Sequence, residues 1–229
     1  RMEADLTGDG PSEQQIRPRK RGRSSKVTRS MILSAASEEF SENGYDAATT
    51  ASIARRAGVT QPLVHYHFGS KERLWKTTVN ELFDRLNARL AAKSEELEGM
   101  GPACRLAGIG HAFIDFTIEA PQLARMINHD GVVEGARLEW LVDEHVRPLA
   151  EVWEKEIEAA REAGLIKDIP APFLSFMFVG AAQLFFNLSP LVTQLFGLEP
   201  RSPETAKEYA NALIEVFLKG CDRSSDADA

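Results

Sequence analysis

Apolar residues recur along most of this chain at the three- and four-residue spacing of a helix face, with polar residues between them. The clearest stripe lies in the segment 70–97 and consists of Val79, Leu82, Phe83, Leu86 and Leu90. The same spacing predicts further helices over 27–43, 104–119, 121–129, 134–163, 172–187 and 203–219, and Pro148 is expected to kink or divide the fourth of these. No run alternates with the period of a strand for long enough to require a sheet. The sequence therefore predicts an all-α protein.

The segment 49–74 predicts two short helices joined by a glycine turn and followed by the start of a long helix. Gly58 can adopt the left-handed conformation that ends the first helix, and Pro62 falls in the first turn of the second, where a missing N–H does little harm. The hydroxyl groups that can cap the three helices belong to Thr49 or Thr50, Thr60 and Ser70. This layout is typical of a helix-turn-helix, whose second helix enters the DNA major groove.

The second short helix has two different faces. Val64 and Phe68 lie four residues apart and are expected to hold the helix against its neighbours. The side chains left to face outward are those of Gln61, Leu63, His65 and Tyr66. Glutamine pairs well with N6 and N7 of adenine, and leucine can contact a thymine methyl group. The outward face is therefore a candidate for base readout.

Basic residues are concentrated near the N-terminus, although the whole chain has a formal net charge of −7. Residues 17–76 contain 12 basic and 5 acidic side chains, whereas residues 77–229 contain 14 basic and 25 acidic ones. This asymmetry predicts that the basic end contacts DNA. Residues 1–26 are expected to be a disordered tail with a basic arm. The arm either enters an A·T-rich minor groove or only adds nonspecific attraction.

The segment from Thr28 to about Val79 resembles the DNA-binding domain of the TetR family of bacterial transcriptional regulators. The matching residues are Phe40, Gly44, Thr49, Thr50, Ile53, Ala54, Ala57, Gly58, Val59, Thr60, Tyr66, His67, Phe68, Ser70, Lys71, Glu72 and Leu74. The sequence departs from the family pattern at His65, where a tyrosine is common, and at Gln61, where a lysine or arginine is common. One phosphate contact of the family is therefore not carried over at His65.

The resemblance implies an effector-gated regulator, most simply a repressor that binds a palindromic operator as a homodimer. The residues expected to contact DNA are Arg19, Arg21, Arg23, Thr49, Thr50, Thr60, Gln61, Pro62, Leu63, His65, Tyr66, His67 and Lys71. The DNA-binding domain, 27–76, is then followed by an effector-binding and dimerisation domain, 77–221, and by a disordered tail, 222–229. The alternative is an all-α ligand-binding or enzymatic domain whose basic end gives nonspecific or architectural DNA binding.

Large apolar side chains with a few polar neighbours in the C-terminal part are candidates for the walls of a pocket for a small, largely apolar effector. They are Phe113, Phe116, Met126, His129, Trp140, Trp153, Phe176, Met177 and Gln183. Ordinary core packing is the alternative for each of them. The sequence does not identify the effector.

The segment 173–192 is apolar and about long enough to span a bilayer, but it contains Gln183, Asn187 and Pro190 and has no charged flanks. Burial on both sides predicts the same composition. We therefore expect one face to pack on the protomer's own core and the other on a second subunit. The family resemblance implies a four-helix interface between subunits, with Phe173, Phe176, Gly180, Ala181, Leu184, Leu213, Val216 and Phe217.

The other chemistry-bearing residues form no recognisable active site. Cys104 and Cys221 are too few for a disulfide framework or a zinc site, which fits a reducing cytoplasm, and no secretory signal peptide is evident. His111 and Asp115 lie four apart, but no clustered spacing supports a metal site around them. The expectation is a cytoplasmic protein with no catalytic residue, no metal, no cofactor and no membrane partner.

Overall fold

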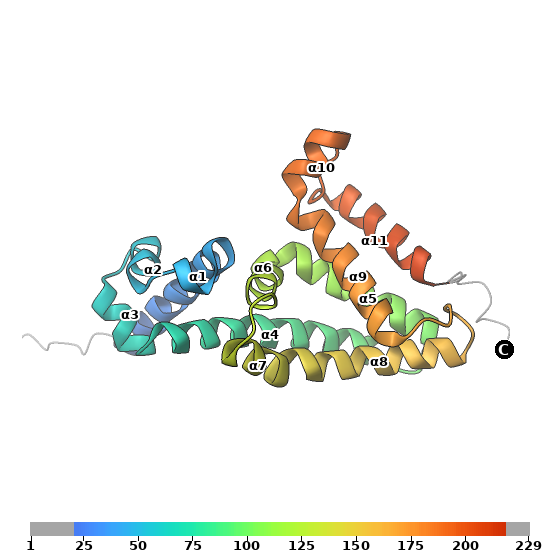
Figure 1. Cartoon of the computed structure of the whole chain (residues 1–229), viewed down its shortest axis with the longest axis horizontal. Helices are drawn as coiled ribbons and strands as arrows, with labels where there is room; N and C mark the ends of the chain where they lie inside the picture. The colour runs from blue at the N-terminus through green and yellow to red at the C-terminus, as the bar shows by residue number, and fades with distance from the viewer. Residues whose placement is uncertain (1–20, 219–229) are drawn as a thin grey trace, which may run out of the picture.

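The computed structural model describes residues 21–218, with side chains from residue 25 onward, and every regular element in this range is helical. The predicted all-α class is therefore confirmed. The elements are α1 (Arg21–Ala47), α2 (Thr50–Arg56), α3 (Gln61–Phe68), α4 (Lys71–Glu96), α5 (Pro102–Glu119), α6 (Pro121–Asp130), α7 (Ala136–Leu141), the π-helical η1 (Val142–Val146), α8 (Arg147–Glu162), α9 (Ala171–Asn187), α10 (Ser189–Phe196) and α11 (Pro203–Phe217). Helices α1 to α3 gather at one end of the long helix α4, and the body packs along the rest of it (Figure 1).

Helices α1 to α3 form the predicted small domain around an apolar core. Its large buried side chains, each at most 2% exposed, are Ile32, Phe40, Ile53, Val64, Phe68, Leu74 and Trp75. The last two belong to α4, so the small domain borrows part of its core from the helix that leads into the body. A three-helix unit of this size buries too little apolar surface to be stable without such support.

Helix α1 is longer than the sequence pattern predicts. It begins at Arg21 rather than at Val27, so the end of the expected basic arm is helical. It also continues past Gly44, whose φ of 71° and ψ of 174° interrupt the helical geometry, to Ala47. The predicted stop signal is therefore a kink inside the helix. Residues 1–20 and 219–229, which hold most of the expected tails, lie outside the described part of the chain.

Side-chain caps begin α2 and α4, as the hydroxyl pattern predicts. The Thr49 hydroxyl accepts a hydrogen bond of 3.0 Å from the N–H of Ser52, and the Thr49 N–H donates back to the Ser52 hydroxyl. This is a capping box, with serine in place of the usual acidic or amide residue. The Ser70 hydroxyl accepts a bond of 3.1 Å from the N–H of Arg73. Thr60 occupies the N-cap position of α3 but makes no side-chain cap bond there.

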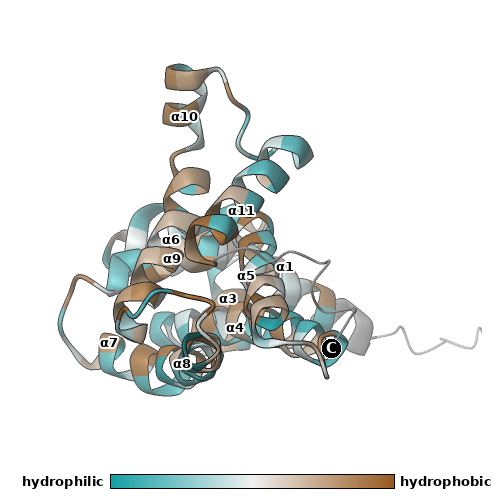
Figure 2. Ribbon diagram, turned by 90° about the vertical axis from the view of Figure 1, so that its right-hand side faces the viewer, coloured by the Kyte–Doolittle hydropathy of each residue, from teal (hydrophilic) through white to brown (hydrophobic). Residues whose placement is uncertain are grey.

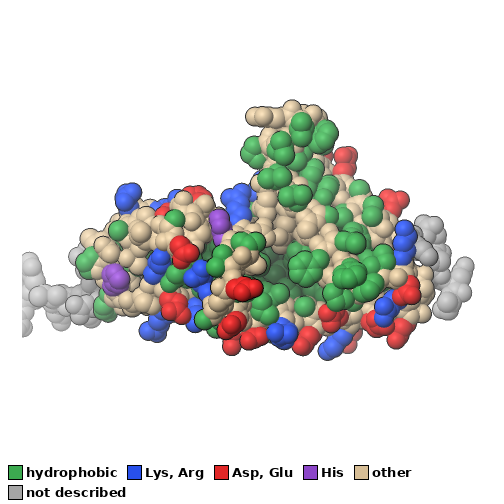
Figure 3. Space-filling view, viewed as in Figure 1, with side chains coloured by type: hydrophobic (Ala, Val, Ile, Leu, Met, Phe, Trp, Pro, Cys, Tyr) green, Lys and Arg blue, Asp and Glu red, His purple; other side chains and the backbone are tan. Residues whose placement is uncertain are grey.

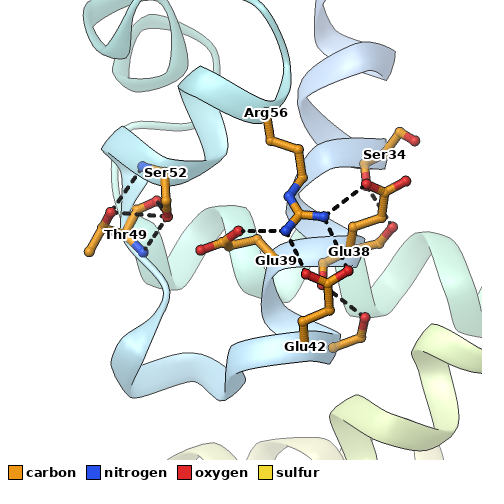
Figure 4. Close-up of polar contacts among 9 residues, drawn as sticks. Ser34, Glu38, Glu39, Glu42, Thr49, Ser52 and Arg56 are labelled. Carbon is orange, nitrogen blue, oxygen red and sulfur yellow. Dashed lines mark hydrogen bonds and ion pairs between the residues drawn. The ribbon is translucent and has the colours of Figure 1, made fainter.

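A cluster of one arginine and three carboxylates joins α2 to α1. The guanidinium of Arg56 lies 3.2 Å from Glu38, 3.2 Å from Glu39 and 2.5 Å from Glu42 (Figure 4). The hydrogen bond from Arg56 lowers the pKa of Glu42, and the same bond raises the pKa of Arg56. Because the three glutamates lie on two successive turns of α1, the cluster fixes the position of α2 against it.

The helix expected over 134–163 is divided at Pro148. Helix α7 ends at Leu141, a π-helical turn follows, and α8 begins at Arg147. A proline at position 148 has no N–H to donate to the carbonyl of Glu144, and its ring would clash with that carbonyl in a regular α-helix. The chain therefore widens into the π turn immediately before the proline.

Helices α9, α10 and α11 rise from the body (Figure 1), and α9 and α10 meet at a bend of 73°. Hydrophobic residues lie on both sides of α9 (Figure 2). The side that packs on the body consists of Leu174, Phe178, Ala182 and Phe186. Exposed apolar residues on these three helices and their connection are Phe173, Phe176, Met177, Leu184, Leu188, Leu191, Leu195, Phe196, Leu198 and Val216. No single helix within residues 21–218 is long and apolar enough to cross a membrane. The bent pair α9–α10 together has the length and apolar composition of a membrane span, and no other feature of this range supports one.

Candidate DNA interface and ligand cavity

The outward face of α3 is largely exposed, as predicted. Gln61, His65 and Tyr66 are exposed, and Leu63 is half-buried. Tyr66 is the clearest case, because 81% of its surface is accessible and it packs only edge-on against the neighbouring His67 ring. A large aromatic side chain with a phenolic hydroxyl at this position is available to contact a phosphate.

Thr50 of α2 orients two of these side chains. The Nε2 atom of Gln61 donates a hydrogen bond of 3.0 Å to the Thr50 hydroxyl, and Nε2 of His65 lies 3.4 Å from the same oxygen. On the other side of the ring, Nδ1 of His65 lies 3.1 Å from the carbonyl oxygen of Gly69. The tautomer with hydrogen on Nδ1 satisfies both contacts. Gln61 keeps one N–H and its carbonyl oxygen, which are the two groups needed to pair with adenine.

Lys71 has a structural role that the sequence analysis does not predict. Its ammonium donates hydrogen bonds of 2.9 Å to the carbonyl of Tyr45 and 3.0 Å to that of Ala48, and it lies 4.3 Å from the centre of the Tyr45 ring. The lysine thus ties the start of α4 to the end of α1. In this conformation the charged ammonium of Lys71 is bound to carbonyl groups of α1. Its contact with a DNA phosphate stays a prediction.

The predicted basic arm lies mostly beyond the structure. Arg19 is outside the described residues, and Arg21 and Arg23 have a helical backbone in α1 without described side chains. Further along α1, the guanidinium of Arg29 lies 5.2 Å from the centre of the Phe68 ring of α3.

The body encloses a cavity of about 340 Å³ between α4, α5, α6, α8, α9 and α11. The face shown in Figure 3 is hollowed at the middle of the body, and hydrophobic side chains surround the hollow. Three rings form the best-packed part of the wall: Phe113 and Trp153 have their centroids 5.8 Å apart, and Phe178 lies 5.4 Å from Trp153. A cavity of this size and composition is typical of a small-molecule site.

Five of the nine predicted pocket residues line this cavity. They are Phe113, Phe116, Trp153, Phe176 and Gln183. The other four do not line this cavity, and their contact with an effector stays a prediction. Met126 is buried in the core, Met177 is 55% exposed, Trp140 packs on Trp75, and the His129 ring lies against Gly44. A helical period shows which residues share a face, but not which neighbour that face meets.

Several wall residues have no cavity signal in the sequence. Phe83 and Leu86 belong to the apolar stripe of α4, and Phe178 belongs to an apolar helix, so the pattern predicts only that they are buried. Ser175 carried no signal at all, although it lines the cavity and its hydroxyl oxygen is buried. Its spacing of eight residues, two turns, from Gln183 on α9 would have placed both on the same face.

Helix α6 connects the cavity to the DNA-binding domain. Asn128 lines the cavity, while the next residue, His129, lies on Gly44, where an added Cβ would come 3.3 Å from its Nδ1. The buried Asp130 accepts a hydrogen bond of 2.5 Å from Nε of Arg137, whose guanidinium lies 4.1 Å from the centre of the Tyr45 ring. Helix α6 therefore has cavity contacts on one side and contacts with the kink of α1 on the other.

The residues predicted for the subunit interface fall into two groups. Phe173, Phe176, Gly180, Leu184 and Val216 are exposed, and Ala181 and Phe217 are half-buried. Leu213 is only 8% exposed and packs in the protomer's own core, so its contact with a second subunit stays a prediction. Phe176, Gly180 and Phe217 also line the cavity, so the expected interface and the cavity share a boundary on α9 and α11.

Comparison with known proteins agrees with the helix-turn-helix geometry. Residues 32–78 match the profile of "Bacterial regulatory proteins, tetR family". The chain is 24% identical over 204 residues to the HTH-type transcriptional regulator RutR of Escherichia coli K12, covering 88% of this chain and 93% of RutR. It is 36% identical over 109 residues to the HTH-type transcriptional activator FasR of Mycolicibacterium smegmatis, covering 46% and 48% of the two chains.

Solved structures share the fold over most of the chain. The ketosteroid transcriptional regulator KstR2 of Mycobacterium tuberculosis superposes with a TM-score of 0.67 at 17% identity, over 84% of this chain and 95% of its own. AibR, in complex with isovaleryl coenzyme A and operator DNA, superposes with a TM-score of 0.68 at 17% identity, over 83% and 97%. At this identity the likeness establishes the fold and not the ligand. The match over residues 32–78 therefore identifies the N-terminal helix-turn-helix as a DNA-binding domain of the kind found in bacterial regulatory proteins of the tetR family.

Proposed function

We propose that this chain is an effector-responsive transcriptional regulator, most simply a repressor, that binds a palindromic operator as a homodimer. The observation that carries the proposal is the position of α6, which borders the cavity through Asn128 and contacts the α1 kink through His129. A molecule that fills the cavity meets the same helix that supports the DNA-binding domain. AibR, a protein of similar fold, has been solved in complex with both isovaleryl coenzyme A and operator DNA, so one protein of this fold binds both kinds of partner.

The regulator has two proposed states. In the DNA-binding state, two α3 helices of a dimer enter successive major grooves on one side of the duplex. In the effector-bound state, displacement of α6 and α4 changes the separation of the two helix-turn-helix domains. Effector and DNA then weaken each other's binding by the same factor, with a free energy of about 1–3 kcal/mol.

Selection from random-sequence DNA tests this proposal. A regulator of this kind enriches one palindrome whose half-sites lie about one helical turn apart. The Tyr66→Ala variant serves as the control, because it removes a predicted phosphate contact from α3 and leaves the cavity intact. Uniform binding to all sequences would favour the alternative, an architectural or nonspecific DNA-binding role for the basic end.

A further inference from the structure

The chemistry of the cavity wall restricts what the cavity can bind. Its lining is aliphatic and aromatic, and no Asp, Glu, Lys, Arg or His side chain among residues 21–218 belongs to it. An ion that enters such a space loses its hydration and gains no opposite charge. The wall therefore accepts a neutral molecule and rejects an ionised one.

Polar groups on the wall are few, and their hydrogen-bonding states differ. The Thr117 hydroxyl already donates a bond of 3.0 Å to the carbonyl of Phe113. Asn128 is exposed, so it marks an edge of the cavity that is open to solvent. Gln183 is half-buried on α9, two turns or about 12 Å along the helix from Ser175. Ser175 is half-buried, and among these wall residues it is the one with a buried oxygen that has no hydrogen-bond partner within residues 21–218.

The hydroxyl of Ser175 is the unusual feature. Its oxygen is buried and has no hydrogen-bond partner within the part of the chain that the structure describes. A serine inside a helix ordinarily bonds to the carbonyl one turn earlier or points to water. Leaving a buried hydroxyl without a partner costs free energy, so rotation about the Cα–Cβ bond of Ser175 toward the adjoining cavity is favoured when a ligand there offers a partner.

We propose that the cavity binds an uncharged, mainly hydrocarbon molecule with one hydroxyl or carbonyl group, and that this group hydrogen-bonds to Ser175. The hydrocarbon part packs on Phe113, Trp153 and Phe178, and any charged portion of a larger ligand stays outside. This inference rests on the proposed role of the cavity as the effector site, and it specifies the chemical class of that effector.

Two ten-carbon probes test the proposal on the full-length protein without DNA. The first is 1-decanol and the second is decanoate at pH 8, where the carboxyl group is ionised. Binding is followed by tryptophan fluorescence, since Trp153 lies in the wall. We expect 1-decanol to bind at least about tenfold more tightly than decanoate, because the wall supplies no counter-charge. Equal or tighter binding of decanoate, or no binding of either probe, overturns the proposal.

Variants of two hydroxyl residues locate the hydrogen bond. Ser175→Ala should weaken 1-decanol binding about five- to tenfold, the effect of one lost hydrogen bond. Thr117→Val is the matched control, because it removes a wall hydroxyl that is already satisfied, and its effect should stay below about twofold. Ser175→Ala should also raise the melting temperature of the free protein, since it removes an unpaired buried polar atom. Unchanged 1-decanol affinity in Ser175→Ala contradicts the assignment.

The two proposals can fail separately. A protein that selects a palindromic operator but binds 1-decanol no better than decanoate remains a regulator with a different effector class. A protein that binds 1-decanol through Ser175 but shows no sequence preference in DNA retains the cavity chemistry and loses the regulatory role. If Ser175→Ala does not fold, as judged by circular dichroism, Ser175→Cys provides the same comparison with a weaker donor.

Discussion

The Arg56 cluster allows a quantitative test of how the helix-turn-helix is held together. Arg56→Ala removes the cation that α2 places against three carboxylates of α1, and it leaves the three negative charges close together. Because α2 positions α3 directly through Thr50, loosening α2 should disturb the outward face of α3 as well. We expect both lower stability and weaker operator binding.

The expected loss of stability follows from the exposure of each partner. The side chains of Glu38 and Glu42 are 46% and 48% exposed, so each pair with Arg56 contributes about 0.2–1 kcal/mol. The side chain of Glu39 is 9% exposed, and leaving a buried polar group without its partner costs about 1–3 kcal/mol. Together these contributions predict that Arg56→Ala lowers the free energy of unfolding by about 1.5–5 kcal/mol at pH 7.

The pH dependence gives the prediction a direction. Hydrogen bonding to Arg56 lowers the pKa of Glu42 in the folded protein. The stabilisation that the Glu42–Arg56 pair contributes is therefore fully present above the pKa that Glu42 has in the unfolded chain. It is lost as the pH falls through the lower pKa that Glu42 has in the folded protein. The difference in stability between wild type and Arg56→Ala should narrow once the pH drops below about 4.3, the ordinary pKa of glutamate.

Urea unfolding followed by circular dichroism, at pH 7 and in steps down to pH 3, measures both effects. Arg55→Ala is the matched control, because Arg55 is the adjacent arginine of α2, is exposed, and forms no ion pair within residues 21–218. Its unfolding free energy should stay within about 0.5 kcal/mol of wild type. Equal losses in the two variants, or a difference that widens in acid, would refute the assigned role of the cluster.

Three further predictions concern the interfaces. Tyr66→Ala should weaken binding to all DNA sequences and reduce its dependence on salt, whereas Gln61→Ala should relax the preference at one base step by about 1–3 kcal/mol, as measured by titration of operator variants. Gly180→Glu should abolish the dimer, as measured by sedimentation. The protomer should stay folded, because a Cβ added at Gly180 meets nothing within 4 Å. Ala91→Glu, on the exposed side of α4, is the control and should leave the dimer unchanged. Deleting residues 1–20 should lower the affinity for the operator and make that affinity less dependent on salt concentration. If the binding curves of the deleted and full-length proteins superimpose at low and high salt, residues 1–20 have no role in DNA binding.

Local sequence signals determined the helix-turn-helix. A threonine before an apolar run can cap a helix with its own hydroxyl, and a glycine can adopt a positive φ, without help from distant residues. Thr49 and Ser70 accordingly cap α2 and α4, and Gly58 has a φ of 66° in the turn before α3. The same locality explains why Val64 and Phe68, four apart on α3, are buried as predicted.

Only the tertiary structure decided which residues share the cavity. Helical periodicity identifies an apolar face but not the helix that it meets, so Met126 and Trp140 were predicted for the pocket while Phe83 and Phe178 were not. The sequence does not show that the hydroxyl of Ser175 is unpaired, because the hydrogen-bond partners of a serine depend on the residues that surround it in the folded protein.

The same limit applies to polar groups whose partners lie far away in the chain. The ammonium of Lys71 reaches back 26 residues to the carbonyl of Tyr45, and Gln61 reaches back 11 residues to the hydroxyl of Thr50. Caps and turns depend on bonds between residues three or four apart, which the sequence alone can specify. Contacts across tens of residues depend on how whole helices pack, and that packing is settled by the combined burial of many side chains at once.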